Sequence, residues 1–293
     1  MAIARRGFLT SAGLGLAAAV VPGVVRGRNL ASKLQVACVG VDGMGFSDLS
    51  QVGSHPSVQF VGFCDIDTNR FGRADETFPG VPHFRDYREM FAQLDESVDA
   101  VLVDTPDHMH APVAVAAMQQ GKHVYCQKPL AHTAWECRQM RLWAEKAGVT
   151  TQMGNQIHSH VAYRLGTRLV RDGVIGKVRE VHSWIGVTGN QRTRLFAAPP
   201  AAPVPANVDW NLWIGAAAMR AYAPAYHPFT WRDWQDFGGG ALGDFGCHVL
   251  DPVFTATGIS TPLRVQAANS GINSQVWPTY ETVRYEFAGT ELT

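Results

Sequence analysis

A glycine-rich turn between a buried strand and a helix is the feature that most constrains the fold. The segment LQVACVG, residues 34–40, is apolar and β-branched, which is typical of a strand buried on both faces of a parallel sheet. Glycines at positions 43 and 45 follow it, directly before residues 46–52, which can begin a helix. Such a turn leaves backbone N–H groups at the positive end of a helix dipole, so it can receive a pyrophosphate.

A second apolar run supports a dinucleotide as the ligand. VQFVGFCD, residues 58–65, ends in Asp65, 20 residues after Gly45, where a carboxylate meets the adenosine ribose in dinucleotide-binding domains. The turn departs from the G-x-G-x-x-G pattern because an aspartate stands where the second glycine belongs. We predict that the phosphates lie on Gly40, Asp42, Gly43, Met44 and Gly45.

Strands and helices are predicted to alternate through the first half of the chain. Six strands with crossover helices make a doubly wound parallel sheet, whose ligand crevice lies at the carboxyl ends of the strands. We expect Asp107 to cap the helix that ends at Met118. The expected strands are 34–40, 58–65, 81–84, 98–104, 122–126 and 149–153, and the other expected helices are 46–52, 69–77, 86–94 and 133–147.

Polar residues collect where these strands end. They are Asp65, the loop 105–110, the run Gln127-Lys128-Pro129, and Asn155 with His158. Each has a simpler explanation, since loops are polar and a proline after a strand ends it. Their coincidence at one edge of the sheet favours a ligand site.

Composition describes an ordinary globular protein. The 293 residues suggest about two domains, with 46% apolar and 17% charged residues. The formal net charge is zero and no long basic run occurs, so nothing favours a nucleic-acid partner.

The first 30 residues are predicted to be a targeting segment. RRGFLT, residues 5–10, is a twin-arginine pattern, and a weakly apolar stretch, residues 11–25, follows it. Glycines and Pro22 within that stretch make it a poor membrane anchor. We therefore expect export, with no stable membrane span after processing.

The second half of the chain carries a group suited to proton transfer. If a helix begins near Ala241, then Asp244, His248 and Asp251 share one face, at i, i+4 and i+7. A carboxylate one turn from an imidazole can orient it and raise its basicity. The trio could also bind a metal, but acid–base work is favoured and no metal is expected.

The same half is expected to form an α/β domain, residues 156–293, after a nucleotide-binding domain, residues 31–155. Strands at 177–187, 263–268 and 282–287 would form one large sheet. A long excursion rich in alanine and proline, residues 195–228, carries many aromatic residues. These either stack on sugar rings or pin the excursion to the sheet, and we expect one or two substrate contacts among them.

The chain resembles the Gfo/Idh/MocA oxidoreductases, most closely their exported, twin-arginine branch. The resemblance rests on GVDGMG (40–45), CDID (64–67), TPDHMH (105–110), HVYCQKPLA (123–131), TQMGNQIHS (151–159), DWNLWIG (209–215) and WRDWQDFGGGALGDFGCHVLD (231–251). It implies a Rossmann domain, then an α/β domain with a large open, mainly antiparallel sheet that covers the nicotinamide and forms a homo-oligomer. The family's E-K-P motif is Gln127-Lys128-Pro129 here, so the lysine is kept and the acid is lost. Because the chain stops shortly after residue 287, we expect the second sheet to be truncated.

The resemblance and the residues together predict an exported NAD(P)-dependent oxidoreductase that transfers hydride between a nicotinamide cofactor and a sugar, polyol or glycoside hydroxyl. One alternative is a glycoside hydrolase that retains NAD and acts by transient oxidation and elimination; another is a nucleotide-holding protein without turnover. NAD is expected over NADP because Asp65 would repel a 2′-phosphate.

Residue roles follow from this prediction. His248 is the expected base, Asp244 orients it, and Lys128 stabilises the charge that develops on the substrate oxygen. The remaining expected cofactor contacts are Asp65, Asp67, Thr105, Pro106, His108, His110, Gln127, Lys128 and Asn155. The expected substrate contacts are His158, Tyr163, Tyr226, Trp231, Arg232 and Asp251.

Overall fold

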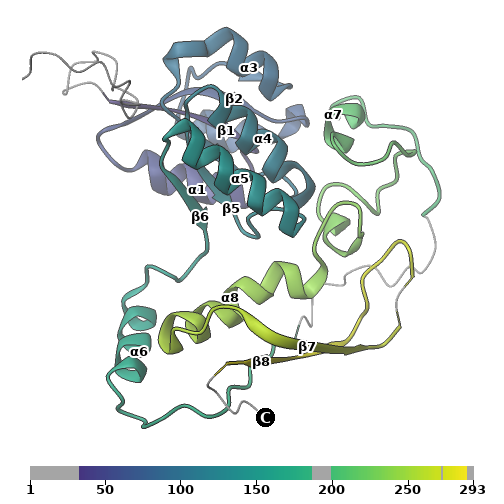
Figure 1. The fold of residues 1–293 in the computed structure, drawn as a ribbon. Helices are drawn as coiled ribbons and strands as arrows, with labels where there is room; N and C mark the ends of the chain where they lie inside the picture. Colours follow the sequence, from purple (N-terminus) through teal and green to yellow (C-terminus); the bar gives the residue numbers. More distant parts are fainter. Residues whose placement is uncertain (1–32, 187–198, 272, 289–293) are drawn as a thin grey trace, which may run out of the picture.

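The computed structural model describes residues 33–186, 199–271 and 273–288. The twin-arginine pattern lies outside these described residues. The chain forms a parallel-sheet domain followed by a second part built on one long helix and a two-stranded ribbon (Figure 1).

The first domain is a six-stranded parallel sheet in the order β3-β2-β1-β4-β5-β6. The order reverses between β1 and β4, which is where a doubly wound sheet opens a crevice for its ligand. The predicted fold class is confirmed. The strands are β1 (Leu34–Val39), β2 (Val58–Cys64), β3 (His83–Phe84), β4 (Ala100–Val103), β5 (His123–Gln127) and β6 (Thr151–Gly154).

Helices cover both faces of this sheet because alternate strand residues point to opposite sides. Val36 and Cys38 of β1 pack toward α1 (Met44–Gly53) and α2 (Gly72–Thr77). Ala37 and Val39 pack on the other side. The helices there are α3 (Tyr87–Leu94), α4 (Asp107–Gln119) and α5 (Ala134–Ala147).

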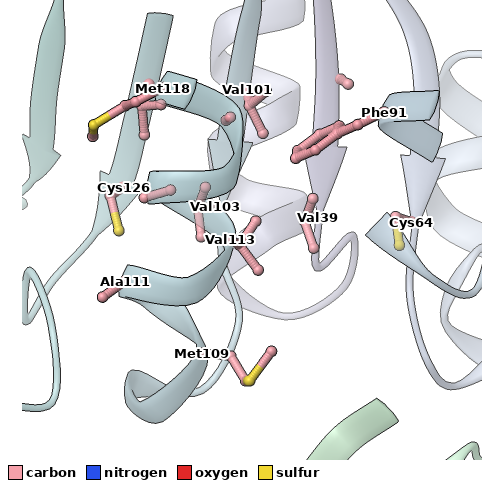
Figure 2. Packing of buried hydrophobic residues seen from close by; sticks show 14 of the residues in the cluster. Val39, Cys64, Phe91, Val101, Val103, Met109, Ala111, Val113, Met118 and Cys126 are labelled. Carbon is pink, nitrogen blue, oxygen red and sulfur yellow. The ribbon is translucent and has the colours of Figure 1, made fainter. Parts of the chain in front are cut away.

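The α4 side of the sheet shows how this core is filled. Met118 and Val113 of α4 lie against Val101 and Val103 of β4, and all four side chains are buried (Figure 2). The continuous apolar runs seen in the sequence are thus strands covered on both faces, as predicted.

The second part contains α6 (Val161–Arg171), α7 (Trp210–Ile214), α8 (Gly240–Thr257), β7 (Pro262–Asn269) and β8 (Glu281–Phe287). β7 and β8 pair antiparallel, and α6 packs on α8 (Figure 1). The predicted strand at 177–187 is wrong, since the described residues 177–186 form none and Val187 lies outside the described residues. Its sequence favours extended backbone but supplies no partner, and β7 and β8 hydrogen-bond to each other.

Hydrogen bonds hold residues 199–237 against the first domain, and an aromatic core fills the space behind them. Thr68 N–H donates to the Asn207 carbonyl at 3.0 Å, and the Asn207 amide donates to Asp67 Oδ1 at 2.6 Å. These bonds fix the segment at the end of β2. The buried rings behind it belong to Trp210, Trp213, Tyr222, Tyr226, Trp231, Trp234 and Phe237.

Substitution of Gly45 tests how closely the chain packs under the glycine turn. A Cβ on Gly45 would overlap the backbone carbonyl of Gly40, which cannot move without displacing β1. Gly45→Ala should therefore destabilise the domain by about 1–3 kcal/mol, measured by denaturant unfolding. Gly166→Ala in α6, where a Cβ meets nothing within 4 Å, is the matched control and should be neutral or slightly stabilising. Equal stability of the two variants would contradict the packing account.

Candidate active site

A cavity of about 730 Å³ lies at the carboxyl ends of the parallel strands. Its wall combines the glycine turn, the ends of β2, β4 and β5, and residues of α7 and α8. A crevice at this edge is the position that the strand order predicts for a ligand.

The glycine turn forms the floor of the cavity. Gly40 has φ 87° and a Cβ there would lie 2.5 Å from the Asp104 carbonyl oxygen, so only glycine fits. Gly43, with φ 59°, is the N-cap of α1, has no side-chain cap, and faces open space. Gly40, Asp42, Gly43 and Met44 line the cavity, while Gly45 packs behind them. This open helix N-terminus fits a pyrophosphate.

Asp65 also lines the cavity, at the end of β2. Its Oδ1 accepts the N–H of Asp67 at 3.0 Å, and its Oδ2 accepts the N–H of Val41 at 3.2 Å. Burial raises the pKa of Asp65 to about 6, although these two N–H groups favour the carboxylate. Each oxygen keeps a lone pair for a further donor, which fits a ribose with two hydroxyls.

Arg70 is a cavity residue that sequence reasoning did not select. Its Nη1 lies 2.7 Å from Asp42 Oδ2 and its Nε 3.3 Å from Asp67 Oδ2. Burial alone would raise the pKa of Asp42, but the Gly43 N–H and the Arg70 guanidinium hold it below its ordinary value. The aspartate in the glycine turn is thus neutralised by a residue five positions after Asp65.

Lys128 and Asp244 join the two parts of the chain in the cavity wall. The Lys128 ammonium at the end of β5 donates to the Asp244 carboxylate and, at 3.1 Å, to the Asp244 carbonyl. Their side chains are only 14% and 9% exposed. Arg232 Nε lies 3.6 Å from the other carboxylate oxygen, so Asp244 is set between two cations. The structure thus places the predicted catalytic lysine and aspartate in direct contact.

His248 lies one turn further along α8, outside the lining of the cavity. Burial and the charge of Lys128 lower its pKa, while Asp244 and Asp251 oppose them. The imidazole is therefore neutral at pH 7, as a proton acceptor must be. Its buried Nδ1 has no hydrogen-bond partner among the described residues. The Asp244 carboxylate, which we expected to orient this imidazole, contacts the Lys128 ammonium and the Arg232 guanidinium.

Three residues of the TPDHMH motif fasten the cavity wall. We expected Asp107 to cap α4, but this prediction is wrong because Pro106 is the N-cap. The Asp107 carboxylate accepts the N–H of Gly239, just before α8, at 3.0 Å. His108 lies 3.0 Å from the Trp213 carbonyl and outside the cavity lining. His110 lies 2.7 Å from the carbonyls of both Thr105 and Pro129.

Some of the remaining residues expected to contact the cofactor line the cavity, and others lie behind its lining. Thr105, Pro106 and Gln127 line the cavity, whereas Asp67 lies behind it as a buried partner of Arg70. Asn155 is not in the lining and donates to the Cys247 carbonyl at 3.1 Å.

Three of the six expected substrate residues, His158, Tyr163 and Asp251, lie in a separate polar cluster. His158 Nδ1 lies 2.7 Å from Asp251 Oδ2, and Tyr163 donates to Thr255 at 2.8 Å. Asp251 is seven residues after Asp244, about 10 Å along the helix. His158, Tyr163, Asp251 and Thr255 do not line the cavity.

Of the aromatic and basic candidates, Trp231 and Arg232 line the cavity. Tyr226 is 4% exposed within the aromatic core and does not, so for Tyr226 the packing explanation holds. Trp213 and His227 also line the cavity and were not chosen from the sequence, because an aromatic-rich segment does not show which rings face a ligand.

The described residues contain neither a metal-binding cluster nor a membrane-spanning helix. No group of three or more His, Cys, Asp or Glu side chains is placed to hold a metal ion. Within those same ranges, no helix has the length and apolar character needed to cross a bilayer.

Comparison with known proteins agrees with this architecture. Residues 34–155 match the family model described as the oxidoreductase family, NAD-binding Rossmann fold. Residues 167–292 match that described as the oxidoreductase family, C-terminal alpha/beta domain. The chain belongs to the Gfo/Idh/MocA oxidoreductase family, so the family resemblance seen in its motifs is confirmed. Membership of the twin-arginine branch stays a prediction.

Curated relatives share part of the chain. A levoglucosan dehydrogenase of Pseudarthrobacter phenanthrenivorans is 27% identical over 158 residues, which cover 54% of this chain and 32% of the relative. Glycosyl hydrolase family 109 protein 1 of Shewanella sp. (strain ANA-3) is 30% identical over 154 residues, covering 50% of this chain and 33% of the relative. The matched part thus spans about a third of each relative.

A solved structure shares the fold. The WlbA dehydrogenase from Bordetella pertussis, in complex with NADH and UDP-GlcNAcA, has a TM-score of 0.63 at 19% identity. The similarity covers 89% of this chain and 73% of that one.

Asp65 gives a pH test of nucleotide binding. Ribose hydroxyls donate to the ionised carboxylate, so NAD affinity should be nearly full at pH 8 and fall as the pH drops through about 6, the folded-state pKa. Asp65→Ser should weaken NAD binding about tenfold at pH 8 and flatten this pH dependence. Calorimetric titration between pH 5 and pH 8 measures both effects.

The control is Asp172→Ser, since Asp172 is an exposed residue after α6 and should leave both unchanged. NAD affinity of the unmodified protein that is constant from pH 5 to pH 8 would rule out this role for Asp65.

Proposed function

We propose that the protein is an exported NAD-dependent oxidoreductase that acts on a secondary hydroxyl of a sugar, polyol or glycoside. The observation that carries the proposal is the Lys128–Asp244 contact in the wall of the cavity that begins at the glycine turn. A nucleotide on that turn and the Lys128–Asp244 pair at the end of β5 would lie in the same cavity.

Oxidation of the substrate alcohol requires the loss of a hydride from its carbon and of a proton from its hydroxyl group. When bound, NAD supplies the acceptor for the hydrogen that leaves the carbon with its electron pair. His248 is the proposed acceptor of the hydroxyl proton, since its neutral imidazole is in the state to accept it. It lies outside the cavity lining, one turn after the lining residue Asp244 on α8, so this role requires the reacting hydroxyl to lie at the α8 edge of the cavity. Lys128 stabilises the negative charge that develops on the oxygen, while Asp244 holds the ammonium group in place.

A carbohydrate substrate is supported by the wall and by the relatives. Trp213 and Trp231 give the cavity apolar ring surfaces, which suit the faces of sugar rings. The levoglucosan dehydrogenase among the relatives has a carbohydrate in its name.

NAD is proposed over NADP because the carboxylate of Asp65 lies where a 2′-phosphate would approach. Arg70 is matched by Asp42 and Asp67, so its charge is already compensated.

A glycoside hydrolase that retains NAD is the second candidate. It is favoured by the glycosyl hydrolase family 109 relative. It is also favoured by the contacts of Asn207 with Asp67 and Thr68, because they hold residues 199–237 beside the expected nucleotide site, where they would slow the release of NAD. A nucleotide-holding protein without turnover is the third candidate, favoured by the loss of the acid in the E-K-P motif.

One assay separates these candidates. The purified protein is mixed with a panel of sugars, polyols and glycosides, with and without added NAD, and absorbance at about 340 nm and products are followed. An oxidoreductase forms one NADH per product and needs added NAD. A hydrolase gives many turnovers on bound nucleotide without net reduction, and a holding protein gives no product.

Export and self-association are also part of the proposal. The twin-arginine pattern at residues 5–6 supports export. Leu263 and Val265 of β7 are 74% and 53% exposed, which supports packing of the β7–β8 ribbon against another copy in a homo-oligomer.

The proposed catalytic roles predict selective losses. Lys128→Ala and His248→Ala should each lower turnover about a hundredfold or more, because each removes a group that acts on the reacting oxygen. NAD affinity should change little in either variant. The melting temperature should change little in His248→Ala but fall in Lys128→Ala, which leaves the buried Asp244 carboxylate without its lysine partner. Asp244→Asn should do less harm, since the amide oxygen still accepts from Lys128. Near-full turnover in both alanine variants would refute the assignment, and unfolding would favour structural roles.

The export proposal is tested by Arg5→Lys with Arg6→Lys. Lysine does not reproduce the guanidinium geometry that the export receptor reads, so folded protein should stay in the cytoplasm. Cell fractionation and immunoblotting measure its location. If the variant leaves the cytoplasm as efficiently as the original, export does not depend on this pattern.

A further inference from the structure

The side chain of Gln127 occupies the place where the E-K-P motif has its acid, and it is 4% exposed. Its Oε1 accepts the backbone N–H of Lys128 at 2.8 Å. Its Nε2 donates to Asp48 Oδ2 at 2.6 Å. The orientation of the amide is therefore fixed at both ends, because only its oxygen can accept from Lys128 and only its nitrogen can donate to a carboxylate.

Asp48 brings a carboxylate to this place from a different element. It lies on α1, the helix whose N-terminus forms the glycine turn, 79 residues before Gln127. Charge-assisted hydrogen bonds of this length are among the stronger ones in proteins. The contact thus links the nucleotide-binding helix to the residue that precedes Lys128.

Two other ionisable groups, Asp104 and Tyr125, lie close enough to Asp48 to feel its charge. Both carboxyl oxygens of Asp104, at the end of β4, are buried. Burial, followed by the charge of Asp48, raises the pKa of Asp104 well above its ordinary value. Burial and the same two acids also raise the pKa of Tyr125 on β5. A second ionised carboxylate at position 127 would therefore face strong repulsion.

We infer that Asp48 and Gln127 are a matched pair in which the carboxylate has moved from position 127 to α1, and that this pair positions Lys128. The glutamine is then required by Asp48, since a glutamate at 127 would set two carboxylate oxygens 2.6 Å apart. This inference rests on the proposed function of Lys128. It makes Asp48 and Gln127 positioning residues, because they contact each other and the Lys128 backbone. Gln127 Oε1 also accepts from Gln156 Nε2 at 3.4 Å, and Asp48 also interacts with Asp104.

Exchanging the two groups tests the pairing. The variants are Gln127→Glu, Asp48→Asn, and the double variant that carries both, in which a carboxylate at 127 can accept from an amide at 48. Gln127→Glu should lower the melting temperature more at pH 8 than at pH 5.5, because the proton that relieves the repulsion is lost as the pH rises. The double variant should recover most of the loss at pH 8.

Two further readouts separate positioning from stability alone. With a substrate found in the panel, Gln127→Glu should lower kcat about tenfold with little change in the KM for NAD, and the double variant should return to within about twofold. Independently of any substrate, the ¹³C resonance of reductively methylated Lys128, assigned by its loss in Lys128→Arg, should shift in Gln127→Glu and return in the double variant.

Gln51→Glu is the matched control, because it makes the same chemical change at an exposed position of α1 and should alter none of these quantities. Failure of Asp48→Asn to relieve Gln127→Glu, or an unmoved Lys128 resonance, overturns the inference. If Gln127→Glu does not fold, the double variant decides alone, since it must fold and show the original resonance. Recovery of the resonance without turnover of any carbohydrate would uphold the pairing and count against the proposed function.

Discussion

The contact between Lys128 and Asp244 is the interaction on which the site depends. It joins the end of β5 to the start of α8, 116 residues apart, and both side chains are largely buried. A buried charge is tolerated only with its partner, so the pair fixes how the second part lies against the parallel sheet. The bond from Gly239 to Asp107 fastens the same junction. The cavity exists because these contacts close one wall of the crevice.

Charge balance explains how so many acids can surround a site for an anionic nucleotide. Asp42 is matched by Arg70, and Asp244 by Lys128 and Arg232. Burial instead raises the pKa of Asp107 to about 7, so this carboxyl carries only part of its charge near neutral pH. Asp65, with a pKa of about 6, stays mostly ionised there and can accept the ribose hydroxyls. The open N-terminus of α1 is then the favourable place for a pyrophosphate.

The sequence predicted the parallel sheet well because each strand is an apolar run ended by polar or turn residues, a local pattern. The strand at 177–187 failed because strand pairing depends on a partner elsewhere in the chain. Asp107 was misjudged because its partner, Gly239, is 132 residues away. Asp48 was missed for the same reason, since a single acid within a helix does not show what it faces. Motifs identified Lys128 and Asp244, and only the fold showed their contact.

Native mass spectrometry of the purified full-length protein tests the central claim most directly, that one dinucleotide occupies the cavity built on the glycine turn. The account predicts one NAD per chain after mixing with an equimolar NAD and NADP solution, and a smaller NAD adduct in Asp65→Ser. Protein without nucleotide, or an adduct that persists unchanged in the variant, would contradict it.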